Sequence, residues 1–433
     1  MKRTHRFLGL PLLIVAAPAL ALAAGACASD PGDAGSSGGG ERGVGSTTGE
    51  GATSNVSFTS GVTSVTSASS TSTSSASSTT ASSASSTSAS STGSGAPCGA
   101  LALCGGACVD IESDPDNCGA CGSPCAAATP TTAACVAGRC ASTFHLAGVT
   151  RSIAVDATSI YVVASYTTIR MAIEKAPIGG GDFVPITTGE VDPFNLVVDG
   201  AYVYYIDGLD TGAQTIARVP IDGSEPETDY GYVGAATALT VDADNVYWAS
   251  DEAIFKVPKD GSAAPAIVVD TPVQYGAGIA VDATSIYWSV YGNAIGSPGS
   301  ILSAPIGGGP LSTLASNLLF PAEIALVGGT LYFNQPGDGV SPNGSVKSIP
   351  ITGGAAPTVI RPALVAPQPL AADGAAVFYG YDSGHLAKSP VPSGAATELY
   401  GSSMSYVVAI AVDATSVYWV DPYLAHVVRL TPK

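Results

Sequence analysis

The sequence predicts an all-β protein whose main part is a seven-bladed β-propeller. The chain of 433 residues contains 52 Gly and 30 Pro, which disfavours long helices and favours short strands joined by turns. A hydrophobic block recurs seven times at intervals of 40 to 46 residues, the length of a four-stranded propeller blade. The last repeat lacks its fourth strand, whereas a strand-like segment over 142–147 precedes the first repeat. We therefore expect a ring over residues 141–433 that this N-terminal strand closes.

Each repeat begins with an apolar strand, a turn and an aromatic strand, which together form a hairpin. The seven blocks are IAVDATSIYVV from Ile153, LVVDGAYVYYI from Leu196, LTVDADNVYWA from Leu239, IAVDATSIYWS from Ile279, IALVGGTLYFN from Ile324, LAADGAAVFYG from Leu370 and IAVDATSVYWV from Ile410. An Asp in the block stands where an Asx-type hydrogen bond nucleates a turn. We therefore interpret Asp156, Asp242, Asp282 and Asp413 as structural.

A third strand follows each hairpin and runs into Pro and Gly. Five repeats carry a basic residue at the same place on this strand, and the regularity indicates a structural role: Lys175, Arg218, Lys256, Lys388 and Arg429. The repeat resembles the YWTD-type propeller repeat of lipoprotein receptors, most closely at Tyr247-Trp248, Tyr287-Trp288 and Tyr418-Trp419. The Thr-Asp half of that motif is missing or shifted, and seven repeats replace the usual six. The resemblance implies the fold and says little about function.

Residues 1–26 have the pattern of a secretory signal peptide. Lys2, Arg3 and Arg6 precede an apolar run over 7–24, which ends in small residues. The alternative is a retained membrane helix, but Pro11 and Pro18 interrupt the run.

The segment Ala24-Gly25-Ala26-Cys27 resembles the lipobox of bacterial envelope lipoproteins. The resemblance implies an exported protein that a diacylated Cys27 anchors to a membrane. Ala28 follows the cysteine, and by the same resemblance this residue favours the outer membrane, with the protein facing the periplasm or the cell surface.

Residues 27–97 are expected to form a disordered tether. From 46 to 95, 33 of 50 residues are Ser or Thr, so the segment has too little apolar surface to offset its ordering entropy. We interpret it as a solvated linker or as a spacer through the envelope.

Residues 98–140 are expected to form a small cysteine-rich module. The eight cysteines are Cys98, Cys104, Cys108, Cys118, Cys121, Cys125, Cys135 and Cys140. An even count in an exported chain predicts four disulfides, and spacing leaves the connectivity open. Zinc bound at Cys118-x2-Cys121 is the alternative. The string CGGACVDIESDPDNCGACGSPC resembles the repeat of the stigma-specific (Stig1-like) proteins, which implies a disulfide-stapled module without catalytic residues.

Charge and motifs narrow the possible functions. Sixteen Lys and Arg oppose 34 Asp and Glu, a net charge of −18, which excludes a basic nucleic-acid interface. There is no P-loop or HExxH motif. Near the ring axis only Asn195 and Glu323 are candidate ligands, and they leave a Ca²⁺-dependent, lactonase-like hydrolase as an alternative. Otherwise we expect no catalysis, no cofactor and a monomer.

Binding is the function that the loops favour. Aspartates follow the aromatic strands, and aromatic and acidic residues precede the inner strands: Asp207, Asp251, Asp382 and Asp421 in the first set, and Asp192, Phe194, Tyr232, Tyr275, Phe320 and Tyr406 in the second. Both sets are expected on one face, where they would bind an envelope protein or a glycan. A solvated acidic rim and a purely structural envelope protein are the alternatives.

Overall fold

The structure is a computed structural model. It describes residues 98–125, 132–167, 170–187, 192–208, 214–224, 228–232, 234–250, 253–270, 276–292, 298–382, 384–392, 394–401 and 406–433. The predicted signal peptide, Cys27 and the Ser/Thr-rich tether lie outside these residues. Within them, all regular elements are β-strands. No helix in this part is long and apolar enough to cross a membrane.

The cysteine-rich segment contains β1 (Ala102–Cys104), β2 (Ala107–Val109) and β3 (Thr132–Val136). Its eight cysteines form four disulfides: Cys98–Cys108, Cys104–Cys121, Cys118–Cys135 and Cys125–Cys140. The four disulfides were predicted, and the structure selects one connectivity among those that the spacing left open. Since Cys118 and Cys121 are both oxidised, the zinc alternative is wrong for the molecule in this form.

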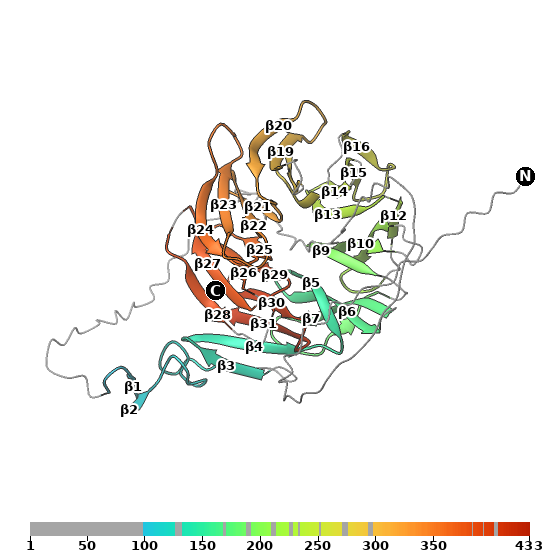
Figure 1. Cartoon of the computed structure of the whole chain (residues 1–433). Helices are drawn as coiled ribbons and strands as arrows, with labels where there is room; N and C mark the ends of the chain where they lie inside the picture. Colours follow the sequence, from blue (N-terminus) through green and yellow to red (C-terminus); the bar gives the residue numbers. More distant parts are fainter. Residues whose placement is uncertain are drawn as a thin grey trace, which may run out of the picture. The chain divides into compact units, whose positions relative to one another are not determined.

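The described residues of the ring form seven antiparallel sheets arranged around a centre (Figure 1). Blade 1 contains β5 (Val149–Val155), β6 (Ser159–Thr167), β7 (Arg170–Pro177) and β8 (Val184–Pro185); blade 2 contains β9 (Pro193–Asp199), β10 (Tyr202–Gly208), β11 (Gln214–Pro220) and β12 (Thr228–Tyr232); blade 3 contains β13 (Ala236–Val241), β14 (Asn245–Ser250), β15 (Ile254–Pro258) and β16 (Ala266–Val269). Blade 4 contains β17 (Gly276–Val281), β18 (Ser285–Val290), β19 (Gly299–Pro305) and β20 (Ser312–Leu318); blade 5 contains β21 (Ile324–Val327), β22 (Thr330–Gln335), β23 (Gly344–Pro350) and β24 (Thr358–Leu364). Blade 6 contains β25 (Leu370–Ala372), β26 (Ala376–Tyr381), β27 (His385–Pro390) and β28 (Thr397–Gly401); blade 7 begins with β29 (Ile410–Val412), β30 (Val417–Asp421) and β31 (His426–Thr431).

Blade 7 is completed by β4 (Arg139–His145) from the other end of the ring sequence. β4 pairs with β31 from His145 opposite His426 to Cys140 opposite Thr431. On its other edge β4 pairs with β3, so the cysteine-rich segment and the ring share one strand. This confirms the predicted closure, which removes a sheet edge that would otherwise stay unpaired.

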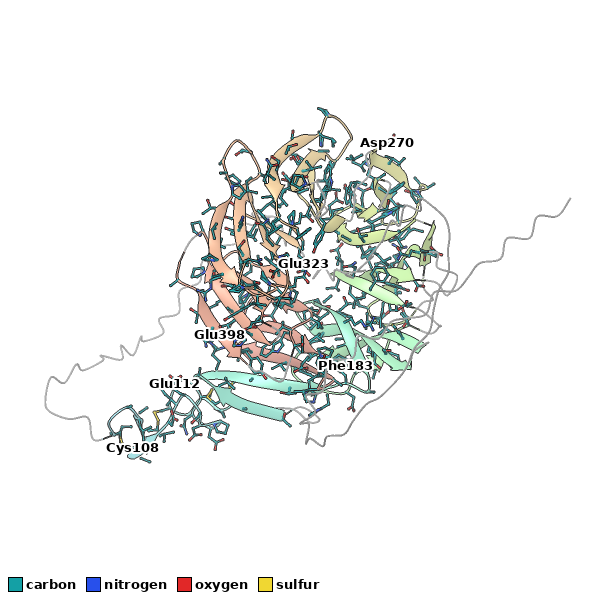
Figure 2. The ribbon with its side chains drawn as sticks, in the orientation of Figure 1. Cys108, Glu112, Phe183, Asp270, Glu323 and Glu398 are labelled. Carbon is teal, nitrogen blue, oxygen red and sulfur yellow. A yellow bond between two sulfur atoms is a disulfide. The ribbon has the colours of Figure 1, made fainter. Side chains whose placement is uncertain are left out.

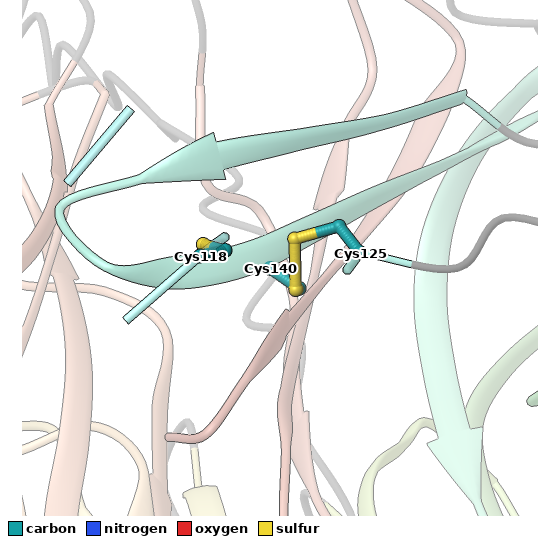
Figure 3. Close-up of side chains that lie close together, drawn as sticks. All are labelled: Cys118, Cys125 and Cys140. Carbon is teal, nitrogen blue, oxygen red and sulfur yellow. A yellow bond between two sulfur atoms is a disulfide. The ribbon is translucent and has the colours of Figure 1, made fainter. Parts of the chain in front are cut away.

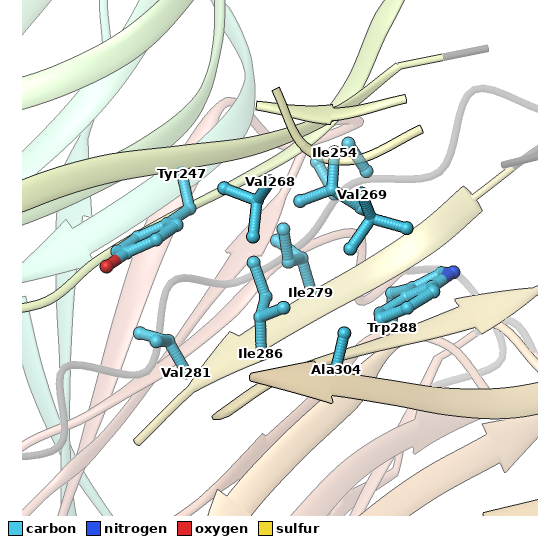
Figure 4. Packing of buried hydrophobic residues seen from close by; sticks show 11 residues of the cluster. Tyr247, Ile254, Val268, Val269, Ile279, Val281, Ile286, Trp288 and Ala304 are labelled. Carbon is cyan, nitrogen blue, oxygen red and sulfur yellow. The ribbon is translucent and has the colours of Figure 1, made fainter. Parts of the chain in front are cut away.

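The hydrophobic core is divided among the interfaces between neighbouring blades. Figure 4 shows the cluster between blades 3 and 4, where Tyr247 and Ile254 pack near Ile286 and Trp288. The next residue of the same strand, Trp248, packs instead against blade 2. Successive side chains of a strand point to opposite faces, so each Tyr-Trp pair supplies both interfaces of its blade.

Close packing near the axis explains the small residues there. A Cβ atom on Gly278 would lie 2.7 Å from the backbone nitrogen of Ile324 and 2.9 Å from the carbonyl oxygen of Ala322, both beside the inner strand of blade 5. Any larger residue at this position would push two inner strands apart.

Candidate binding face

The antiparallel order of the strands defines two faces of the ring. The turns between first and second strands and those between third and fourth strands share one face, which we call the turn face. The loops between second and third strands and those that lead into the next blade share the opposite face, which we call the loop face. Its described segments include 146–148, 319–323, 336–343, 365–369, 406–409 and 422–425.

On the turn face a hydrogen-bond motif repeats in four blades. In blade 4, Asp282 Oδ1 accepts bonds from the backbone nitrogens of Thr284 at 2.7 Å and Ser285 at 2.8 Å. Asp282 Oδ2 accepts a bond from the Tyr287 hydroxyl at 2.8 Å. Asp156, Asp242 and Asp413 make the same set of bonds. The predicted structural role of these aspartates is confirmed.

These bonds control the ionisation of the turn aspartates. Burial would raise the pKa of Asp282, but bonds from the Thr284 backbone, from the Tyr287 hydroxyl and from other donors outweigh it and lower the pKa. The pKa values of Asp156 and Asp413 are lowered by the same balance. The folded turns therefore favour ionised aspartates.

Each of the five periodic basic residues joins its own blade to the next one. Each donates to a backbone carbonyl just beyond the third strand of the following blade: Lys175 to Ile221 at 3.0 Å, Arg218 to Lys259, Lys256 to Ile306 at 3.1 Å, Lys388 to Lys433 at 2.9 Å, and Arg429 to Ile178 at 3.1 Å. The last of these bonds links blade 7 to blade 1. The structural role expected from their regular spacing is thus confirmed.

The two axial candidate ligands are also used between blades. Glu323 Oε2 accepts a bond of 2.5 Å from the Leu370 nitrogen of blade 6, and Asn195 Nδ2 donates to the Thr237 carbonyl of blade 3 at 3.0 Å. Figure 2 shows Glu323 near the middle of the ring. Burial raises its pKa to about 8, a shift that the Leu370 bond reduces, so burial favours the protonated form of this carboxyl. The Ca²⁺-dependent, lactonase-like hydrolase stays an untested prediction.

One group of three metal-ligating side chains with converging atoms occurs among the described residues, and it consists of Cys118, Cys125 and Cys140. Their sulfurs belong to two neighbouring disulfides, Cys118–Cys135 and Cys125–Cys140 (Figure 3). Disulfide sulfurs have no thiolate to offer a metal. The group is therefore a covalent staple at the junction of the cysteine-rich segment with β4.

The loop face carries two pairs of aromatic side chains in contact. Tyr406 and Tyr423 in blade 7 lie with ring centroids 4.9 Å apart and are 42% and 71% exposed. Tyr291, after the second strand of blade 4, stacks on Phe320, which precedes blade 5, also at 4.9 Å. Exposed aliphatic side chains occur in the loops of this face too: Leu319 next to Phe320, Leu424 next to Tyr423, and Val340 in a separate loop of blade 5. The loop face therefore exposes apolar surface at several places, most of it around Tyr406, Tyr423 and Leu424 of blade 7.

Two of the predicted acidic residues are not exposed on this face. Asp207 is buried, and its Oδ1 accepts a 2.8 Å bond from the Asp192 nitrogen. Asp421 is buried too, and its Oδ1 accepts bonds from the nitrogens of Tyr423 at 3.0 Å and Leu424 at 3.2 Å. These carboxylates hold the loops in shape. Of this acidic set, Asp192 and Asp382 remain accessible, and Asp382 has a left-handed φ of 47°.

The remaining predicted residues divide into three groups. Phe320 and Tyr406 are brought into the two aromatic pairs described above, whereas Phe194 is partly buried against the core between blades 2 and 3. Tyr232 ends β12, and its side chain lies outside the described set, as do Asp251 and Tyr275 altogether. The sequence interpretation missed Leu319, Val340 and Leu424. Val340 could have been found as an apolar residue in a polar stretch, and Leu319 and Leu424 as the sequence neighbours of Phe320 and Tyr423.

Two histidines meet at the edge of the loop face. His145 and His426 are opposite each other on β4 and β31, and their ring centroids lie 4.3 Å apart. Burial and the neighbouring His145 lower the pKa of His426. The third histidine of the ring, His385, instead places Nδ1 2.7 Å from Glu398 Oε1 on blade 6.

Comparison with known proteins supports the propeller fold and says nothing more specific about this chain. No protein-family model matches the chain, and no curated protein matches it either. Among solved structures, one described as YCF48 bound to D1 peptide is similar, with a TM-score of 0.53 and 9% identity over 68% of this chain and 97% of that chain. YCF48 from Cyanidioschyzon merolae has a TM-score of 0.50 and 10% identity over 66% and 96%. At these identities the matches support the propeller and do not assign a family.

Proposed function

We propose that the protein is an exported binding protein without catalytic activity, whose loop face docks a protein partner. The observation that carries this proposal is the exposed cluster of Tyr406, Tyr423 and Leu424 on blade 7. Tyr side chains are enriched in protein interfaces because they bury a large rigid surface and keep a polar tip.

The aliphatic neighbours favour a protein over a glycan. A sugar ring stacks on aromatic faces and needs polar partners, whereas the exposed side chains of Leu424, Leu319 and Val340 gain free energy only by contact with apolar atoms. Accessible acids such as Asp382 lie on the same face and supply the kind of polar group that borders apolar anchors in interfaces. The net charge of −18 favours a partner with a basic surface and argues against nucleic acid.

A propeller of similar fold provides a precedent. The structure described as YCF48 bound to D1 peptide is a propeller in complex with a peptide. The precedent supports the architecture as a peptide-binding scaffold, and the loop residues of the present chain supply its own specificity.

The same proposal places the protein outside the cytosol. Four disulfides within the described cysteine-rich segment are typical of an oxidising compartment. Together with the signal pattern, the Ala24–Cys27 lipobox and Ala28, they support a lipoprotein anchored in the outer membrane through Cys27. The Stig1-like assignment of the module belongs to this proposal as well.

Site-specific photocrosslinking in cells tests the docking face. A photoreactive residue replaces Tyr423 or Tyr406 on the loop face, and the control replaces Leu311, which is also 42% exposed but follows a third strand on the turn face. We expect one discrete protein adduct from the loop-face positions and none from Leu311. Equal labelling from both faces, or binding to a glycan array that Tyr423→Ala abolishes, would contradict a protein partner.

The anchor is tested separately with Cys27→Ala. We expect this variant to lose incorporation of a labelled fatty acid and to leave the membrane fraction, because a thioether-linked lipid requires the cysteine sulfur. Unchanged lipid labelling would show that the lipobox interpretation is wrong, without bearing on the docking face.

A further inference from the structure

The His145–His426 pair joins the two ends of the ring sequence. His145 is the last residue of β4 and His426 the first residue of β31, and the register places them opposite each other. The chain has four histidines, and one of them, His5, belongs to the predicted signal peptide. Two of the remaining three are thus neighbours on the strand pair that closes the propeller.

The two rings are accessible and have nitrogen atoms available. His145 is exposed and His426 is half-buried. The ring planes meet edge to face at 84°, and no hydrogen bond to either ring is found among the described residues, in contrast to the bond between His385 and Glu398. Side chains opposite each other on antiparallel strands have Cβ atoms about 5 Å apart, a span that two imidazoles can bridge by binding one ion.

The backbone around the pair is held in place. The Leu146 nitrogen, directly after His145, donates to the Ala425 carbonyl, directly before His426, at 2.9 Å. Asp421 is opposite His426 on the neighbouring strand β30, and its buried carboxylate secures the loop that leads into β31. The two imidazoles therefore project from a fixed part of the sheet, which limits the entropy lost when they bind an ion.

We propose that His145 and His426 bind a divalent transition-metal ion such as Zn²⁺ or Ni²⁺. Imidazole nitrogen is a preferred ligand of these ions, and the exposed side of the pair leaves room for water in the other positions. Asp421 contributes negative charge nearby, and its Oδ1 already accepts two backbone bonds. Among the described residues it belongs to no group of three side chains whose ligand atoms lie close enough to hold one metal ion, so we do not count it as a ligand. Rotation of the two rings about their side-chain bonds brings one nitrogen of each toward the ion.

The bound ion links β4 to β31 and thereby stabilises the closure. An ion that binds the closed ring and has no preformed site in the unfolded chain shifts unfolding to higher temperature by mass action. The ion also lies beside the loop that carries Tyr423 and Leu424, so it stiffens one side of the loop face.

The test is thermal unfolding of the full-length chain, followed by Trp fluorescence, with Zn²⁺ or Ni²⁺ alone and with added EDTA. We expect saturating metal to raise Tm by about 5 °C, and EDTA to reverse the rise. His145→Ala and His426→Ala should each abolish the shift, whereas His385→Ala, the matched control, should retain it.

Two results would overturn the site: no shift in the natural chain at millimolar metal, or a shift that survives in both His145→Ala and His426→Ala. If His426→Ala does not fold, the exposed position His145 decides alone. Isothermal titration then adds a direct readout, since one Zn²⁺ per chain is expected before His145→Ala and none after it.

Discussion

On the turn face the same Asp–Tyr contact recurs in four blades and the same inter-blade bond in five, whereas the described loops of the loop face each have their own contacts. On the turn face the charged side chains hydrogen-bond to other groups of the ring. The loop face buries some carboxylates to shape its loops and leaves aromatic side chains exposed. In this molecule regular spacing therefore marks structure, and the surface that we propose for binding lies where the spacing is irregular. Five changes test this contrast, in order of their effect on stability.

Phe144→Ala should have the largest effect. Phe144 is buried on the closing strand, in a cluster with Ile153, Tyr418 and Val427. Removing a buried aromatic ring costs about 3–5 kcal/mol of unfolding free energy, which urea denaturation measures. Leu424→Ala, an exposed change on the loop face, is the control and should change stability little. Similar losses in both variants would show that the closing strand is not special.

Asp282→Ala should rank second. It removes the acceptor of two backbone bonds and of the Tyr287 hydroxyl bond, which leaves polar donors unpaired. We expect a loss of about 2–4 kcal/mol in urea denaturation. Asp282→Asn retains an acceptor oxygen and should lose clearly less. A loss below the error of the measurement in Asp282→Ala would remove the basis for calling the turn face structural.

Acid should weaken the turn face. The pKa values of Asp156, Asp282 and Asp413 are lower in the folded chain than in the unfolded one. The stability that these groups contribute is therefore present above pH 4 and is lost as the pH falls through their folded pKa values. We expect the urea midpoint to fall steeply below about pH 4. Asp282→Asn, which cannot titrate there, should show a shallower fall than the natural chain.

Lys256→Met should have a smaller effect. It removes one bond from blade 3 to the Ile306 carbonyl of blade 4 but keeps the aliphatic stem, so we expect about 1 kcal/mol of lost stability. Lys347→Met is the matched control on the third strand of blade 5. Burial lowers the pKa of Lys347, so replacing that charge should be neutral or stabilising. Equal losses would mean that the inter-blade bond contributes nothing specific.

Tyr423→Ala should change stability least, by less than about 0.5 kcal/mol, because the side chain is mainly exposed. Its effect should be on binding instead, measured as loss of the adduct that a crosslinker at Tyr406 forms. Leu311→Ala on the turn face should preserve both stability and adduct. A destabilised Tyr423→Ala would mean that the Tyr406–Tyr423 pair supports the ring rather than a partner.

The sequence by itself determined the propeller, the number of blades, the closing strand and the structural use of the turn aspartates. Each of these depends on local pattern: strand alternation, turn chemistry and a period repeated seven times. Four disulfides also follow from the even cysteine count together with the signal-peptide pattern. The repeats even predicted that Lys175, Arg218 and their equivalents are structural, although not which atoms they bind.

Only the tertiary structure decided the contacts between residues that are distant in sequence. It selected the disulfide connectivity, buried Asp207 and Asp421 beneath their loops, stacked Tyr291 on Phe320 and brought His145 to His426. The spacing of residues in the sequence does not predict these contacts, because the path of a loop determines whether a carboxylate contacts solvent or a backbone nitrogen. The pairing of the two histidines exists only because the ring closes.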